Sequence, residues 1–425
     1  MRFRISSIYV FFLSILIFTG YRITPAGKWH NEIVDYNSFY KPVGLNIAVG
    51  DGITWKNGKI ATRYPPGFPL VIAFSYITGW YIHIPFEKVL QIIILLSMSW
   101  GSVLIFKTSN LFLDSITSFI ASFLWILYPL NLWLINRPLS EPVFIPFLYL
   151  AIYFYLRLFF KTKYARKDIY LALFTGALTG VSSLIRPINI LLGIIFGLLL
   201  IGRWLYLTDR RKNKWIFLVS IVLLSGNLMS VLPWELYVYN KTGKIITLSE
   251  GGFYSIRDGI TAFSGYKHYR RLLNLPYPIY KVSLQAANLQ DSAKLNSFQE
   301  IVEFLGGQFR ENPSGVLGFV VIKIVRALFG TDSQNPKKEL VILLIQVPFF
   351  LLSIIGSFLL WKKKKEAVVV LWSIVLYTWC MTVLVLSIVR YMAPVIGLLF
   401  IPISYALSYF FRISHSAFWP ELPPK

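Results

Sequence analysis

Long apolar runs, each able to cross a bilayer, recur along this chain and constrain its fold more than any other feature. A transmembrane helix needs about 20 consecutive, mainly apolar residues. About ten such runs are present, beginning near Ile5, Val89, Ser115, Pro142, Asp168, Asn189, Trp215, Leu340, Ala367 and Met392. Only 14% of the residues are charged, against roughly a quarter in soluble domains. We therefore predict an all-α polytopic membrane protein with about ten transmembrane helices.

The basic residues lie in clusters between the apolar runs. The net charge of +23 would suit nucleic-acid binding, but clusters placed in this way are typical of cytoplasmic loops. They lie at Arg157–Lys167, Arg203–Lys214 and Lys362–Lys365, and Arg2 and Arg4 precede the first run. With ten spans, all of them fall on one side when both termini are cytoplasmic. We expect a multi-pass membrane protein that contacts lipids and no nucleic acid.

One further apolar stretch, Gly67–Ile84, would make an eleventh span. Counting it would move the first two basic clusters outside, against the positive-inside rule. We therefore expect it near the outer interface, as a juxtamembrane part of the first external loop. This leaves two large external segments, 24–86 and 234–338, in a single membrane-embedded domain of residues 1–425.

The second external segment contains an apolar stretch with two basic residues. Lys323 and Arg326 are three positions apart within Pro313–Gly330, so they share one face of a helix. An apolar helix with one basic face is typical of a membrane interface. We predict an amphipathic interfacial helix here.

Two carboxylates of the first loop are candidates for acid–base chemistry. Asp35 lies about a dozen residues after the first span, in the apolar and aromatic setting VDYNSFY. Such a setting can make a carboxylate a better base. Glu32 is three residues earlier, where it would share a helical face with Asp35 and divide the acid and base roles. The alternative is that Asp35 is a solvated surface group.

Glu141 opens the fourth apolar run, in NRPLSEPVF. In one interpretation it is a helix-start carboxylate favoured by the helix dipole, with Ser140 as the cap. In the other, Glu141 and Arg137 form an acid and a base at the outer mouth of the bundle, where they bind a polar head group. The sequence leaves both open.

Two further arginines, Arg186 and Arg390, lie at predicted external ends of spans. Arginine is costly at the membrane edge and usually has a partner or a ligand. Its forked donors suit phosphate oxygens. Because Arg63 and Arg137 are predicted on the same side, the four favour a site for an anionic head group. The alternative is that they reach individually toward the interface.

Several reaction classes have no support in the sequence. Cys380 is the one cysteine, and no histidines have metal-ligand spacing, so no metal cluster is indicated. Neither a nucleophile elbow nor a phosphate-binding loop appears.

The remaining motifs resemble those of a known superfamily. DYNSFYKPVGLNIAVGDG followed by TRYPPGFPLVIA resembles the first external loop of GT-C glycosyltransferases. The nearest group, similar to glycosyltransferase family 39, includes aminoarabinose transferases and protein O-mannosyltransferases. LSEPVF, GALTGVSSLIRPINILL, LPWELYVYNKTGK and RYMAPVIGLLF follow in the family's order. Each motif is degenerate, but five in order, from Asp35 to Phe400, are specific together.

This resemblance implies an inverting glycosyltransferase of the cytoplasmic membrane, with its active site on the outer face. A sugar would pass from a polyprenyl-phosphate donor to a hydroxyl of a glycan, lipid or protein. Asp35 matches the general base with Glu32 in reserve, and Glu141 matches a second acidic residue of the site. The matches to donor-phosphate residues are Arg63, Arg137, Arg186 and Arg390. Phosphate is already a good leaving group, so no cofactor is firmly implied, although a divalent cation is compatible with the chemistry.

The chain also departs from the family, and two other functions stay open. The family often has two adjacent acidic residues where this chain has NEIVDY, so the base is either Asp35 or Glu32. A lipid transporter or flippase would have a similar number of spans, but it should carry ionisable groups near mid-span. Nearly all such groups lie here at span ends or in loops, which favours an enzyme. An oligosaccharide ligase of related fold would use the same outer-face site.

Overall fold

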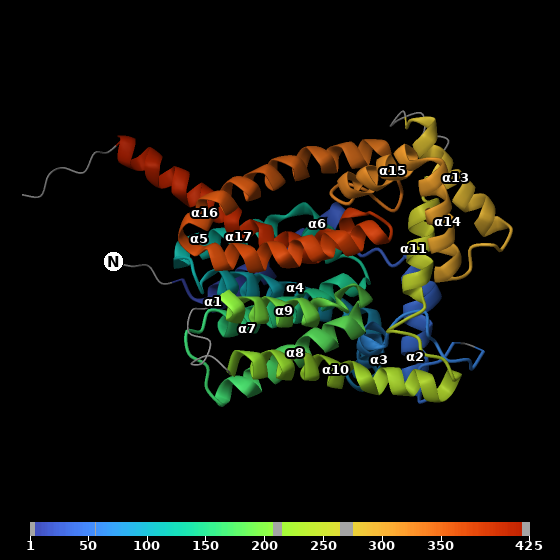
Figure 1. Ribbon diagram of the computed structural model, residues 1–425. Coiled ribbons are helices and arrows are strands. Elements are labelled where there is room, and N and C mark those ends of the chain that lie inside the picture. The colour runs from blue at the N-terminus through green and yellow to red at the C-terminus, as the bar shows by residue number, and fades with distance from the viewer. Residues whose placement is uncertain (1–4, 56, 207–214, 264–274, 419–425) are drawn as a thin grey trace, which may run out of the picture. The chain divides into compact units, whose positions relative to one another are not determined.

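The computed structural model describes residues 5–55, 57–206, 215–263 and 275–418, and these are overwhelmingly helical (Figure 1). Within these ranges no β-strand forms, and Thr54 and Ile60 make an isolated bridge. The all-α prediction is confirmed. Arg2, Arg4 and most of the cluster Arg203–Lys214, which the topology prediction used, lie outside the described residues.

Seven helical stretches among the described residues are long and apolar enough to cross a membrane. They comprise α4 (Phe86–Ser109), α7 (Ser140–Phe159), α8 (Lys167–Ile185), Pro187–Leu205 with η3 (Pro187–Asn189) and α9 (Leu192–Tyr206), α10 (Trp215–Thr242), α16 (Pro336–Leu384) and α17 (Val389–Phe418). Two shorter apolar helices, α1 (Ser7–Ile23) and α5 (Ser115–Leu127), lie at predicted span positions.

Helix α16 covers two of the predicted spans. Its backbone leaves helical geometry at Lys364, where φ is −141° and ψ is 54°. This break lies within the lysine cluster that separates the apolar runs predicted from Leu340 and Ala367. The order of the helices therefore follows the order of the apolar runs.

The chain divides into two compact units. Unit 1 comprises Met1–Leu248, Phe349–Ile374 and Pro394–Lys425, and unit 2 comprises Ser249–Pro348 and Val375–Ala393. In unit 1, α7 is covered along most of its length. The ring of its Tyr155 stacks on Phe196 of α9 with the centroids 3.9 Å apart. The indole of Trp125 in α5 donates to the Tyr149 hydroxyl at 3.2 Å.

The segment between α1 and α4 carries short helices, as expected of a loop with juxtamembrane helices. It contains η1 (Pro25–Gly27), the π-helical turn η2 (Tyr36–Tyr40), α2 (Lys41–Val49) and α3 (Gly67–Tyr81). Helix α6 (Pro129–Leu134) lies between α5 and α7. Gly44 of α2 packs closely on α3, because a Cβ there would come within 2.7 Å of the Ile72 side chain.

Unit 2 contains α11 (Gly251–Thr261), α13 (Tyr277–Asp291), α14 (Phe298–Glu311) and α15 (Pro313–Arg326). Ser297 and Glu300 form a capping box at the start of α14, as the spacing of these two residue types favours. Two small cores hold the helices together. One contains Phe263, Leu275, Val282 and Phe319, and the other Ile260, Ala286, Leu295 and Ile301.

The prediction that α15 presents a basic face at the membrane interface is wrong in one respect. Lys323 and Arg326 share a face, but that face is covered, with the two residues 4% and 1% exposed. The exposed positions are mainly apolar and include Leu317, Val320 and Val321. The helix is amphipathic with its basic side turned into unit 2.

Candidate functional site

Asp35 lies at the start of a continuous helical segment that contains a π-turn. The Lys41 N–H donates to the Tyr36 carbonyl five residues earlier, which makes Tyr36–Tyr40 a π-turn that continues into α2. Single π-turns inside helices occur frequently at functional sites. Glu32 lies in irregular chain before this segment and is exposed. The expectation that Glu32 and Asp35 share a helical face is therefore wrong.

The returning part of the first loop contacts Asp35 through Tyr64. The Tyr64 hydroxyl donates to Asp35 Oδ1 at 3.2 Å. Its ring packs on Tyr40 with the centroids 4.6 Å apart, and on Phe39 at 5.6 Å. The guanidinium of Arg63 lies over the Phe39 ring, 5.1 Å from its centroid. Asp35 and Arg63 thus belong to one aromatic cluster, formed by Phe39, Tyr40 and Tyr64.

Glycine at position 67 brings this cluster against the end of α8. A Cβ at Gly67 would come within 2.6 Å of the Leu184 carbonyl oxygen, a separation that Cβ atoms do not adopt. The close approach therefore requires glycine. Two residues after Leu184, Arg186 is followed by Pro187, which favours extended backbone in the preceding residue. Arg186 has φ −142° and ψ 118°, and α8 ends there.

Arg186 forms an ion pair with Glu141. The distance from Arg186 Nη1 to Glu141 Oε1 is 2.7 Å, and the side chains are 13% and 1% exposed. The same nitrogen donates to Ser140 Oγ at 3.0 Å. Leu139 is the N-cap of α7 and no side-chain capping bond forms. Ser140 therefore does not cap α7, and Glu141 pairs with Arg186 rather than with Arg137.

The electrostatic environment of Tyr40 includes charged groups from several parts of the chain. Burial raises its pKa well above the ordinary value, with Tyr64 the next contributor; Arg186 opposes the rise, and Asp35 and Glu141 add to it. Three predicted site residues, Asp35, Glu141 and Arg186, thus act on one buried phenol. They come from the first loop, the start of α7 and the end of α8.

Two other predicted residues have contacts of their own. Arg137 lies over the Trp133 ring at 4.2 Å and donates to the Trp133 carbonyl, and burial lowers its pKa. Arg390 belongs to unit 2, where its Nη1 lies 3.4 Å from Asp332 Oδ2.

Tyr64 is the member of this group that the sequence did not single out. The only indication in the sequence is that Tyr64 lies between Arg63 and the two prolines of RYPPG. This segment is expected to return to the membrane. A tyrosine in an aromatic-rich loop gives no sign of a carboxylate partner 29 positions away, so the contact becomes visible only in the folded chain.

The comparisons identify a fold. Neither the family models nor the sequences of curated proteins give a match. Among solved structures, the archaeal oligosaccharyltransferase AglB from Archaeoglobus fulgidus, in complex with an inhibitory peptide and a dolichol-phosphate, has a TM-score of 0.58 at 13% identity. The alignment covers 99% of this chain and 52% of that chain. This chain therefore spans about half the length of that transferase.

Two further structures are similar. The Archaeoglobus fulgidus enzyme in complex with zinc and sulfate has a TM-score of 0.53 at 14% identity, covering 96% of this chain and 49% of that one. ArnT from Cupriavidus metallidurans, bound to undecaprenyl phosphate, has a TM-score of 0.43 at 12% identity, covering 99% and 80%.

A resident metal is not indicated by side chains in the described ranges. No group of three or more histidine, cysteine, aspartate or glutamate residues lies close enough there to hold an ion. In the group around Tyr40, Glu141 is engaged by Arg186 and Asp35 accepts from Tyr64, so the donor set does not resemble a metal site.

The order of the helices and the likeness to AglB agree: this chain has the GT-C fold of membrane glycosyltransferases.

Proposed function

We propose that this protein is an inverting glycosyltransferase, which moves a sugar from a polyprenyl-phosphate donor to an acceptor hydroxyl on the outer face of the membrane. The observation that carries the proposal is the grouping of Asp35, Glu141 and Arg186 around Tyr40 in a chain with the GT-C fold. A base and fixed positive charge are the two things that this transfer requires.

In the proposed reaction, Asp35 takes the proton of the acceptor hydroxyl. The acceptor oxygen attacks the anomeric carbon, and the bond from that carbon to the phosphate oxygen breaks on the opposite side, which inverts the configuration. Polyprenyl phosphate leaves with the bonding electrons. Positive charge held in place by the fold stabilises the departing phosphate without reorganisation.

The four candidate arginines do not have equal support as donor-phosphate residues. Arg63 lies in the aromatic cluster of Asp35, and Arg186 lies beside Glu141, so both are proposed to face the donor phosphate. Arg137 and Arg390 remain predictions from the resemblance. Glu141 is proposed to position Arg186, because its carboxylate is buried and paired with that guanidinium.

A second candidate function is transfer of a preassembled glycan. It is favoured by the likeness to AglB, which is an oligosaccharyltransferase. The same base and the same positive charge would serve, and the two functions differ in the size of the group transferred. Short and long lipid-linked glycans used as donors distinguish them.

The test compares wild type with Asp35→Asn, both purified in detergent, against a panel of polyprenyl-phosphate sugars. Asp51→Asn is the matched control, because Asp51 is an exposed aspartate of the same loop. Free polyprenyl phosphate and labelled product are measured, with membrane extract as the acceptor source. Removal of a general base should lower turnover about 10²- to 10⁴-fold, while the control stays near wild type.

Each other outcome has a defined meaning. Equal turnover by wild type and Asp35→Asn excludes Asp35 as the base and makes Glu32 the next variant. Binding of a donor by wild type without turnover of any donor, long or short, favours a lipid transporter or flippase instead.

A further inference from the structure

A buried lysine in unit 2 has no counter-ion in the described part of the chain. Lys323 of α15 is 4% exposed. Its Nζ lies 5.6 Å from the centroid of the Phe319 ring, and it makes no hydrogen bond or ion pair with any described residue. Burying an ammonium without a partner is costly, so such groups are normally paired, ligated or neutral.

The Lys323 amine lies where α11 meets the link between α16 and α17. A Cβ built on Gly259 of α11 would come within 3.0 Å of Lys323 Nζ and 2.2 Å of the Val385 carbonyl oxygen. Glycine at position 259 thus allows α11 to pack on the link beside the amine. Two residues beyond Val385, the Ser387 hydroxyl is buried and has no hydrogen-bond partner among the described residues.

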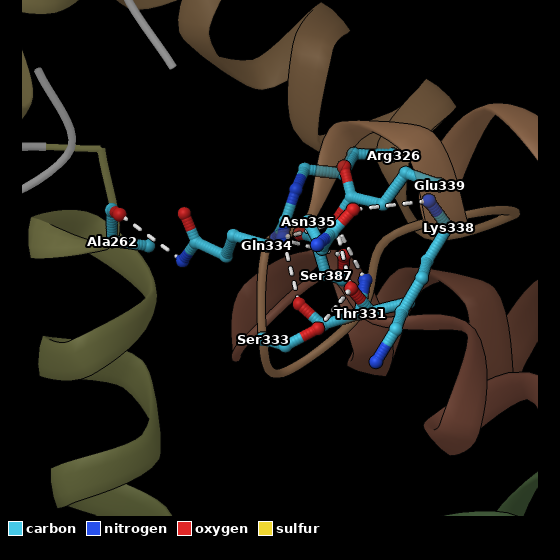
Figure 2. A network of polar contacts seen from close by, with 9 residues as sticks. All are labelled: Ala262, Arg326, Thr331, Ser333, Gln334, Asn335, Lys338, Glu339 and Ser387. Atoms are coloured by element: carbon cyan, nitrogen blue, oxygen red, sulfur yellow. Dashed lines mark hydrogen bonds and ion pairs between the residues drawn. The ribbon is translucent and has the colours of Figure 1, made fainter. Parts of the chain in front are cut away.

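The nearby carboxylates are engaged by other cations. Glu339 Oε1 lies 3.1 Å from Arg326 Nη2 and also accepts from the N–H and the hydroxyl of Thr331 (Figure 2). Asp332 pairs with Arg390, and Asp258 lies 3.8 Å from Arg257. Each of these carboxylates thus has a cationic partner other than Lys323.

The pKa of Lys323 is consistent with an amine that has no anion beside it. Burial and the charge of Arg326 lower the pKa of Lys323 to about 7. No carboxylate counters these two effects. An anion at the amine would supply the negative charge that is lacking and would hold the lysine in its charged form.

We propose that Lys323 is the centre of an anion site in unit 2 that binds a phosphoryl group, with the Ser387 hydroxyl as a further donor. A phosphoryl group fits because it offers several acceptor oxygens to donors, and both candidate groups here can donate. The group belongs either to a lipid headgroup or to free phosphate. The proposal holds whether or not the chain transfers a sugar.

The experiment measures the reactivity of the Lys323 amine and the thermal stability of the full-length protein in detergent near pH 7. Samples contain chloride, inorganic phosphate at matched ionic strength, or undecaprenyl phosphate. Acetylation by an amine reagent is read at Lys323 by mass spectrometry in wild type, so this arm needs no variant. Unfolding is compared for wild type, Lys323→Met and Lys294→Met, which removes an exposed lysine of unit 2.

We expect a phosphoryl compound to slow acetylation of Lys323 several-fold and to raise the unfolding temperature of wild type and Lys294→Met by about 2 °C or more. Lys323→Met should not respond. Protection by inorganic phosphate supports free phosphate as the ligand, and protection by undecaprenyl phosphate alone supports a lipid headgroup. Protection by neither, or an equal shift in Lys323→Met, overturns the proposal.

Discussion

The carboxylate of Glu141 lies 2.7 Å from the Arg186 guanidinium and is almost completely covered, so the start of α7 and the end of α8 are joined by a buried ion pair. Removing one partner of such a pair leaves an uncompensated buried charge. Replacing both with apolar side chains is often close to neutral, because both desolvation costs disappear.

Arg186→Met should therefore lower the free energy of unfolding by about 3–5 kcal/mol. The double variant Glu141→Leu/Arg186→Met should recover most of that loss. Denaturant unfolding in detergent gives both values. A single variant as stable as wild type would show that the pair does not hold the two helix ends together.

Tyr64→Phe removes the hydrogen bond to Asp35 and keeps the ring that packs on Tyr40. Loss of one such bond should cost about 0.5–1.5 kcal/mol of stability. Turnover should fall further, by about tenfold, because the proposed base loses a group that orients it. Turnover of the donor panel by Tyr64→Phe, beside its unfolding curve, checks this. Unchanged turnover would limit Tyr64 to a packing role.

Gly67→Ala places a Cβ where the Leu184 carbonyl already lies. The strain should destabilise the protein by about 1–3 kcal/mol and push the first loop away from Arg186. Gly20→Ala is the control, since nothing lies within 4 Å of a Cβ there. The control should stay within about 1 kcal/mol of wild type. Similar unfolding temperatures for the two variants would contradict the close approach.

Lys323 predicts a particular pH dependence of stability. Its pKa is lowered from 10.5 to about 7 in the folded chain, so the unfolded chain binds an extra proton between these values. Stability should fall as the pH is lowered through this window and level off below about 7, where the folded chain takes up the proton too. Lys323→Met should remove this component when both proteins are unfolded in chloride buffer at a series of pH values. Parallel curves would be inconsistent with a neutral buried lysine.

Glu339→Ala should be more damaging than Glu339→Gln. Glu339 Oε1 accepts from Arg326 and twice from Thr331, so alanine leaves a buried guanidinium and a backbone N–H without this acceptor. A loss of about 3–5 kcal/mol is expected for alanine. Glutamine keeps an acceptor oxygen and should lose less. Equal losses, measured by thermal unfolding, would show that the acceptor geometry at this position is unimportant.

The sequence predicted the long apolar helices well because the length of an apolar run is enough to identify them. Even the break at Lys364 lies where two apolar runs are separated by lysines. The resemblance also implied that Asp35, Glu141 and Arg186 belong to one site, and the charges of all three affect the pKa of Tyr40. Their roles in a reaction remain predictions.

The sequence could not show which side chains pair with one another, or which face of a helix is covered by its neighbours. Residue spacing placed Lys323 and Arg326 on one side of a helix, but only packing against neighbouring helices determines whether that side is covered. Likewise, Glu141 was paired with Arg137 because the two are close in sequence, whereas its partner Arg186 comes from the next helix. The expectation that Glu32 shares a helical face with Asp35 failed because the helix begins after Glu32.

The π-turn at Tyr36–Tyr40 has a consequence for how this site is encoded. A π-turn holds one residue more than an α-turn in the same rise, and each residue of an α-helix advances the side chain by about 100° around the axis. If the same residues formed a regular α-helix instead, the start of the segment would be rotated by about that angle relative to α2. Asp35 would then point away from Tyr64. The orientation of the proposed base therefore depends on the π geometry of this turn as much as on the residues that form it.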